Sequence, residues 1–137
     1  MQSKAMIWRQ ATLIRSQTLD LTPMVPPELL LYQGSIVFRT AGRIPVLEPD
    51  YFGKISVRSI VGSLRNLRLE HLRLTGVLRW ASDDDAKSIQ RAFEAGDLVP
   101  RLEYFVLEQM DSGRAGLMLA TKWQPVSIQL RRKDGIA

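Results

Sequence analysis

Apolar and polar residues alternate along much of the second half of the chain. Between residues 67 and 80, leucines and a tryptophan mostly occupy one parity, whereas a histidine, a threonine and arginines occupy the other. A period of two places these sets on opposite faces of a sheet. The segments 101–108, 116–121 and 125–130 are also strand-rich, with a hairpin-type turn at Asp111-Ser112-Gly113. The pattern predicts a sheet in which 67–80 forms one strand.

A different spacing, typical of a helix, covers residues 82–96. Apolar residues recur every three or four positions around Ile89. Ser82 is the predicted N-cap, with Asp85 three residues later as a variant of the capping box. Gly96 suits the left-handed position that follows a helix. We therefore expect the main helix at about 83–95.

The first half of the chain has shorter patterns. Residues 12–15, 35–40 and 54–58 have strand-like composition. Three prolines between residues 22 and 27 exclude a regular helix or a central strand there. The whole pattern predicts an α+β fold, with a mostly antiparallel β-sheet or small barrel and one main helix. We assign residues 34–137 to this single domain and residues 1–33 to an extended N-terminal arm.

The arm carries apolar side chains that are expected to be covered, either by a neighbouring subunit or by the chain's own sheet. An extended apolar segment that grips a neighbour would contact it through Ile7, Trp8, Leu13, Met24, Val25, Leu29, Leu30 and Tyr32. Both alternatives stay open at the level of the sequence.

Composition limits the chemistry and the cellular locations that are expected for the protein. The 137 residues carry a formal net charge of +5 and no cysteine, which excludes disulfides and thiolate chemistry. The first residues lack the apolar core of a signal peptide, and no stretch approaches the ~20 apolar residues of a membrane span. We expect an intracellular protein, or one that belongs to a larger assembly, that does not bind membranes.

Arginines account for much of the positive charge, and they suit bidentate contacts with phosphate or carboxylate groups. The candidates for binding an anion or an acidic protein surface are Arg65, Arg68, Arg73, Arg79, Arg131, Arg132 and Lys133. If they share one surface, a nucleic-acid-binding module is the alternative to a protein-binding one.

Chemistry-bearing residues form no recognisable constellation. His71 is the single histidine, so one chain cannot supply a site with several histidine ligands. The acidic run 83–85 is explained by helix capping and by the helix dipole, because neighbouring side chains on a helix point about 100° apart. Phosphate-binding loops, nucleophile elbows and zinc-protease motifs are missing from the sequence. We predict no catalytic residue, no metal site and no cofactor.

Several short phrases together resemble the prohead (capsid-maturation) proteases of tailed phages. They are Glu48-Pro49-Asp50-Tyr51-Phe52, Leu74-Thr75-Gly76-Val77-Leu78, Ala92-Phe93-Glu94-Ala95-Gly96-Asp97-Leu98 and Pro125-Val126-Ser127-Ile128-Gln129-Leu130. Their order from Gly42 to Leu130 covers about two-thirds of the chain. In that family a nucleophilic serine follows the glycine-aspartate-leucine phrase, but residues 99–103 contain no serine and Leu102 falls near the expected place.

The resemblance therefore implies the scaffold of that family without its chemistry, because a lone histidine cannot perform acyl transfer. The function expected from the sequence is that of a non-enzymatic interaction protein in a large homo- or hetero-oligomeric assembly. A phage-head component that stabilises or binds the capsid fits best. The alternatives are a basic nucleic-acid-binding module and a hydrolase of the prohead-protease type.

Overall fold

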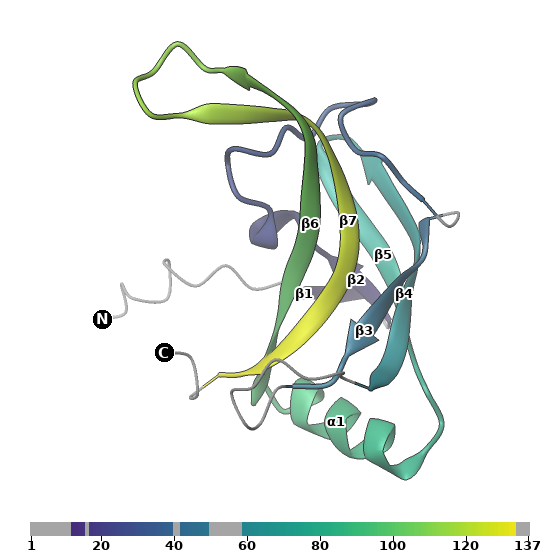
Figure 1. Ribbon diagram of the computed structural model, residues 1–137. Helices are drawn as coiled ribbons and strands as arrows, with labels where there is room; N and C mark the ends of the chain where they lie inside the picture. Colours follow the sequence, from purple (N-terminus) through teal and green to yellow (C-terminus); the bar gives the residue numbers. More distant parts are fainter. Residues whose placement is uncertain (1–11, 16, 40–41, 50–58, 134–137) are drawn as a thin grey trace.

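The computed structural model describes residues 12–15, 17–39, 42–49 and 59–133, and Figure 1 shows their arrangement. Their elements are β1 (Thr12–Arg15), β2 (Thr18–Asp20), the 3-10 helix η2 (Thr22–Met24), β3 (Ile44–Leu47), β4 (Ile60–Glu70), β5 (Arg73–Trp80), α1 (Asp84–Glu94), β6 (Leu98–Asp111) and β7 (Met118–Arg132). The predicted strand at 54–58 lies outside the described residues.

The seven strands form one curved sheet in the order β1-β2-β5-β4-β3-β7-β6 (Figure 1). Neighbouring strands are antiparallel, except that β3 and β7 run parallel. Helix α1 lies across one end of the sheet and buries Ala86 and Ile89 in the core. The α+β prediction, with a mostly antiparallel sheet and one main helix, is confirmed.

The helix begins one residue later and ends one residue earlier than expected, and Gly96 follows it as its local signal predicted. The N-cap is Asp83 and not Ser82, and the Asp83 carboxylate accepts a hydrogen bond from the Ala86 amide at 2.7 Å. Gly96 follows the C-cap with φ +85°, and its amide donates to the carbonyl of Phe93. The Asp97 amide donates to the carbonyl of Ala92, which completes a Schellman motif.

Where it is described, the N-terminal segment is not a separate arm. It contributes β1 and β2 to the same sheet, and β2 pairs with β5. Leu19, Leu21, Val25 and Leu29 are buried in the core that the rest of the chain forms. Burial of these side chains stabilises the folded-back conformation. Residues 17–29 are therefore covered by the chain's own sheet and not by a neighbouring subunit.

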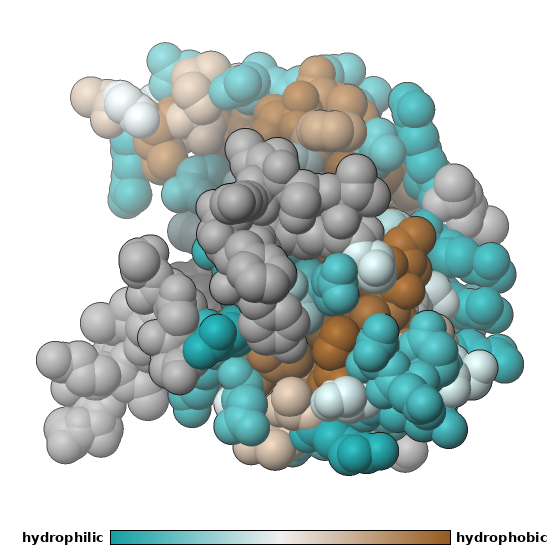
Figure 2. Space-filling model, turned by 60° about the horizontal axis from the view of Figure 1, so that its bottom comes forward, coloured by the Kyte–Doolittle hydropathy of each residue, from teal (hydrophilic) through white to brown (hydrophobic). Residues whose placement is uncertain are grey.

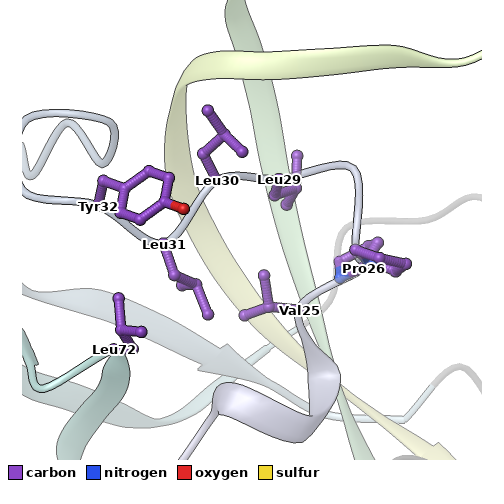
Figure 3. A pocket seen from close by; sticks show the side chains of 8 residues that line it. Val25, Pro26, Leu29, Leu30, Leu31, Tyr32 and Leu72 are labelled. Carbon is purple, nitrogen blue, oxygen red and sulfur yellow. The ribbon is translucent and has the colours of Figure 1, made fainter. Parts of the chain in front are cut away.

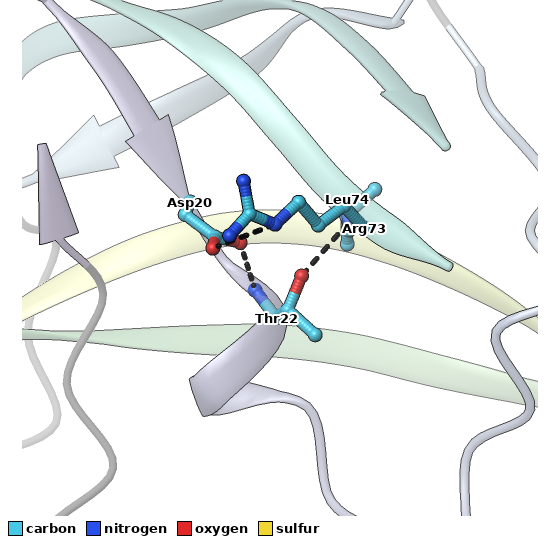
Figure 4. Close-up of polar contacts among 4 residues, drawn as sticks. All are labelled: Asp20, Thr22, Arg73 and Leu74. Carbon is cyan, nitrogen blue, oxygen red and sulfur yellow. Dashed lines mark hydrogen bonds and ion pairs between the residues drawn. The ribbon is translucent and has the colours of Figure 1, made fainter. Parts of the chain in front are cut away.

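A polar contact fixes the end of β2 against β5 (Figure 4). The buried carboxylate of Asp20 accepts from the Thr22 amide at 3.0 Å and pairs with Arg73 at 3.6 Å. The Thr22 hydroxyl in turn accepts from the Leu74 amide at 2.9 Å. Since a buried carboxylate is costly unless it is hydrogen-bonded, these partners hold the N-terminal segment in one register on β5.

Residues 28–37 run beside β7 but form no strand, so the strand predicted at 35–40 is wrong for residues 35–39. Only Leu29 and Ile36 make isolated parallel bridges, to Ala120 and Trp123. The chain leaves β7 between these two points, because the loop at 31–34 bulges outward before Ser35 returns to accept from the Trp123 amide. Strand-like composition there reflects burial against β7 and not a continuous ladder.

The stretch 67–80 is a hairpin and not one strand. Strands β4 and β5 pair from Gly62↔Trp80 to Glu70↔Arg73, and His71 and Leu72 form the two-residue turn. Both turn residues are left-handed, with φ +51° and +62°. A turn of this kind normally carries Asn-Gly, and neither residue is present to reveal it in the sequence.

Replacing His71-Leu72 with Asn-Gly is expected to raise the free energy of unfolding by about 1 kcal/mol, because left-handed backbone costs about 1–2 kcal/mol in most L-residues. Urea denaturation measures the change. Leu72→Ala alone retains a Cβ at the strained position and is the matched control, for which no gain is expected. An equal gain in both variants would contradict the backbone explanation.

Candidate interaction surface

Large hydrophobic side chains are exposed together at the end of the sheet opposite α1. We call this region the apolar end. It comprises Tyr32, Leu72, Phe105, Val106, Leu107, Met110 and Met118. Tyr32 and Leu72 are each 59% exposed and Phe105 is 60% exposed, so water reaches more than half of each. Among the coloured atoms of Figure 2, the nearer ones are mostly hydrophilic apart from one hydrophobic strip, and hydrophobic residues gather again along the more distant upper edge.

The outer half of the β6–β7 hairpin forms the protruding part of the apolar end (Figure 1). From Phe105 to Asp111 every residue of β6 is exposed, so neither face of this strand is covered. The outermost rungs join Gln109 to Ala120 and Asp111 to Met118. An isolated two-stranded ribbon is marginally stable in water, and exposed apolar residues on both faces make it a surface suited to a partner.

A groove of about 280 Å³ forms the hollow part of the apolar end (Figure 3). Its lining is apolar and comes from Val25, Pro26, Pro27, Leu29, Leu30, Leu31, Tyr32 and Leu72. The Leu30 amide donates to the carbonyl of Ala120 on β7, so the groove adjoins the hairpin. Protrusion and hollow thus belong to one continuous surface.

The structure divides the residues predicted to contact a neighbour. Val25 and Leu29 lie in the chain's own core, each 5% exposed, and the prediction that they contact a partner is wrong for the chain as it stands. Met24 and Leu30 are half-buried, and Tyr32 is exposed beside the groove. The side chains of Ile7, Trp8 and Leu13 lie outside the described residues.

The predicted anion-binding residues do not form one surface. Arg68 pairs with Glu70 at 3.1 Å, and Arg73 pairs with Asp20. Arg131 and Arg132 are the last residues of β7, and the amide of Lys133, which follows them, donates to the carbonyl of Asp97 beside α1. Only Arg65 and Arg79 come together, and they are joined by a residue that the sequence did not single out, Arg43.

These three arginines lie on the outer face of the sheet. Arg65 and Arg79 alternate with the buried Leu64 and Leu78 on β4 and β5. The pKa of Arg65 is lowered, and the largest cause is repulsion from Arg43. Partial burial and repulsion from Arg79 lower it further, in that order of size. The Arg65 guanidinium nevertheless stays charged at neutral pH. Among the described residues, no carboxylate forms an ion pair with Arg65 or Arg79.

Catalytic groups do not converge within the described part of the chain. No group of three or more His, Cys, Asp or Glu side chains there is placed to hold a metal ion. His71 is exposed in the β4–β5 turn. Leu102, at the position expected for a nucleophile, is 5% exposed and belongs to the core. The buried Ser127 hydroxyl donates to Glu103 at 2.7 Å. No described helix has the length and apolar character needed to cross a bilayer.

Comparisons of the chain with protein-family models, with curated proteins and with solved structures find no match.

Proposed function

We propose that this protein is a non-catalytic subunit of a protein assembly and that its apolar end binds further copies of the same chain. The observation that carries the proposal is the exposure of apolar residues on both faces of the outer β6–β7 hairpin. A monomer gains nothing from this arrangement, because exposed apolar area is unfavourable and the extended ribbon costs conformational entropy.

A second copy is the partner that fits because the apolar end has complementary parts. The hairpin projects, and the groove beside Leu72 and Tyr32 is hollow. The hairpin of one copy docking in the groove of the next is a head-to-tail contact, which generates rings or filaments. Burying a large apolar side chain contributes about 1.5–3 kcal/mol, so seven partly exposed ones give on the order of 10 kcal/mol. This is comparable with the ~4–15 kcal/mol cost of association.

The position of Leu102 in the core supports a subunit without proteolytic chemistry. Within this proposal, the resemblance to prohead proteases favours a phage head as the assembly, with the protein as a capsid-stabilising or head-associated component. In that setting the protein would be found in the virion or in the host-cell cytoplasm.

Complementary variants test the head-to-tail contact. Phe105→Glu with Leu107→Glu disables the hairpin, and Tyr32→Glu with Leu72→Glu disables the groove. Each variant alone is expected to be monomeric by light scattering, whereas an equal mixture is expected to stop at dimers, since one intact hairpin meets one intact groove. The wild-type protein is expected to form larger species that grow with concentration.

Ile60→Glu is the matched control, because Ile60 is 63% exposed at the start of β4, away from the apolar end. This variant is expected to associate like the wild type. A wild-type protein that stays monomeric at high concentration would contradict self-association. An equal mixture of the hairpin and groove variants that stays monomeric would rule out the hairpin-in-groove contact.

A further inference from the structure

A second surface, on the outer face of β3, β4 and β5, carries concentrated positive charge. Ser63 lies opposite Arg79 in the β4–β5 ladder, and Arg65 lies opposite Val77. Arg43 immediately precedes Ile44, whose partner on β4 is Leu64, so the register places Arg43 across from Arg65. We call Arg43, Ser63, Arg65 and Arg79 the arginine face.

The arrangement of these side chains is specific. The Arg65 Nε donates to the Ser63 hydroxyl at 3.2 Å, which turns the guanidinium towards the side of Arg79. Adjacent strands lie about 4.8 Å apart, so three cations on adjacent strands repel one another at short range. An anion bound between them would relieve this repulsion, which no carboxylate of the described residues offsets by an ion pair with Arg65 or Arg79.

Neighbouring residues add hydrogen-bond donors. A hollow of about 360 Å³ adjoins the arginine face, and its lining combines Leu67, Gly76 and Val77 with the polar residues Thr18, Asn66, Arg68 and Thr75. Hydroxyl and amide groups of this kind commonly contact phosphate oxygens in nucleic-acid complexes. A protein interface normally has a core of large apolar side chains, whereas the apolar residues beside these arginines are the half-buried Pro45 and Val77. The chemistry therefore favours phosphate over the carboxylates of an acidic protein.

We propose that the arginine face binds the phosphodiester backbone of a nucleic acid. Among the residues of the face and its hollow there is no aromatic side chain to stack on bases, so the contact is expected to be independent of sequence. The inference stands apart from self-association, because its residues lie outside the apolar end. A subunit carrying both surfaces would join an assembly through one and hold nucleic acid against it through the other.

Salt dependence of binding tests the proposal with a labelled 20-base-pair DNA duplex of mixed sequence. Each neutralised phosphate contributes about −0.9 to the slope of log K against log salt, so Arg65 and Arg79 together contribute about −1.8 to the expected slope. Arg65→Gln with Arg79→Gln is expected to flatten the slope by about two and to weaken binding about tenfold or more at low salt. Lysine at both positions is expected to retain most of the slope, since it keeps the charges.

The matched control is Arg91→Gln with Arg114→Gln, which removes the same two charges from α1 and from the β6–β7 connection. It is expected to leave the slope nearly unchanged. Equal losses in both double variants would overturn the site in favour of net charge alone. Absence of binding at low salt would overturn it too, as would tighter binding of labelled polyglutamate than of DNA. Hairpin variants that lose self-association are expected to bind the duplex with an unchanged slope, which separates the two proposals.

Discussion

Replacing Trp123 with alanine is expected to lower the free energy of unfolding by about 3–5 kcal/mol, the usual cost of removing a buried tryptophan. The Trp123 side chain is fully buried, and Tyr104 meets its ring edge-on at 6.0 Å. Its indole N–H donates to the carbonyl of Leu30 at 2.9 Å, and its backbone bonds to Ser35 and Val37. Trp123 thus joins the 28–37 segment to β7 together with Ala120, whose backbone bonds to Glu28 and Leu30. Since small domains are stable by only about 5–15 kcal/mol, the loss would be a large share of the total.

Guanidinium denaturation of the Trp123→Ala variant measures this loss. Trp123→Phe is the control, because it keeps a buried ring but removes the donor to Leu30, and its expected cost is about 1–3 kcal/mol. A loss below about 1 kcal/mol in the alanine variant would mean that the 28–37 segment does not depend on this side chain.

Gly62→Ala is expected to destabilise the protein by about 3 kcal/mol, at the upper end of the range for overpacking. A Cβ at Gly62 would lie 2.6 Å from the backbone carbonyl oxygen of Arg79. Relief requires that β4 and β5 move apart where Gly62 pairs with Trp80 and where the Ala81 amide donates to Val61. Backbone atoms cannot turn aside as a flexible side chain can.

Thermal or urea unfolding of Gly62→Ala, compared with Gly113→Ala, separates collision from backbone strain. Gly113 has φ +86° and nothing within 4 Å of a built Cβ, so alanine there costs only about 1 kcal/mol of strain. Similar losses in the two variants would show that the close approach at Gly62 relaxes without cost.

Features encoded by neighbouring residues were predicted correctly. The helix at 84–94 follows from an acidic cap, an apolar stripe and Gly96, all within one stretch of sequence. Strand β1 and the turn after Asp111 also follow from local composition. In each case the deciding interactions span only a few residues, so a single sequence suffices.

Features that depend on contacts between residues far apart in the sequence were not predicted. Arg43 and Arg79 are 36 positions apart, and only the order β5-β4-β3 brings them to one face. The exposed β6–β7 hairpin has the composition of a buried strand, because β-branched and aromatic residues suit both environments. The left-handed His71-Leu72 turn is imposed by the β4–β5 pairing and not by its own residues.

The parallel pairing of β3 with β7 has a consequence for how the chain folds during synthesis. Val46 meets Ile128, and Leu29 and Ile36 meet Ala120 and Trp123, so residues separated by more than 80 positions must find one another. The ribosome delivers β7 after every other strand described here. Until β7 is made, β3 lacks its neighbour on the side away from β4. The apolar residues of 28–37, which pack against β7, stay uncovered for the same time. Such high contact order predicts slow folding and a nascent chain that depends on chaperones until β7 emerges.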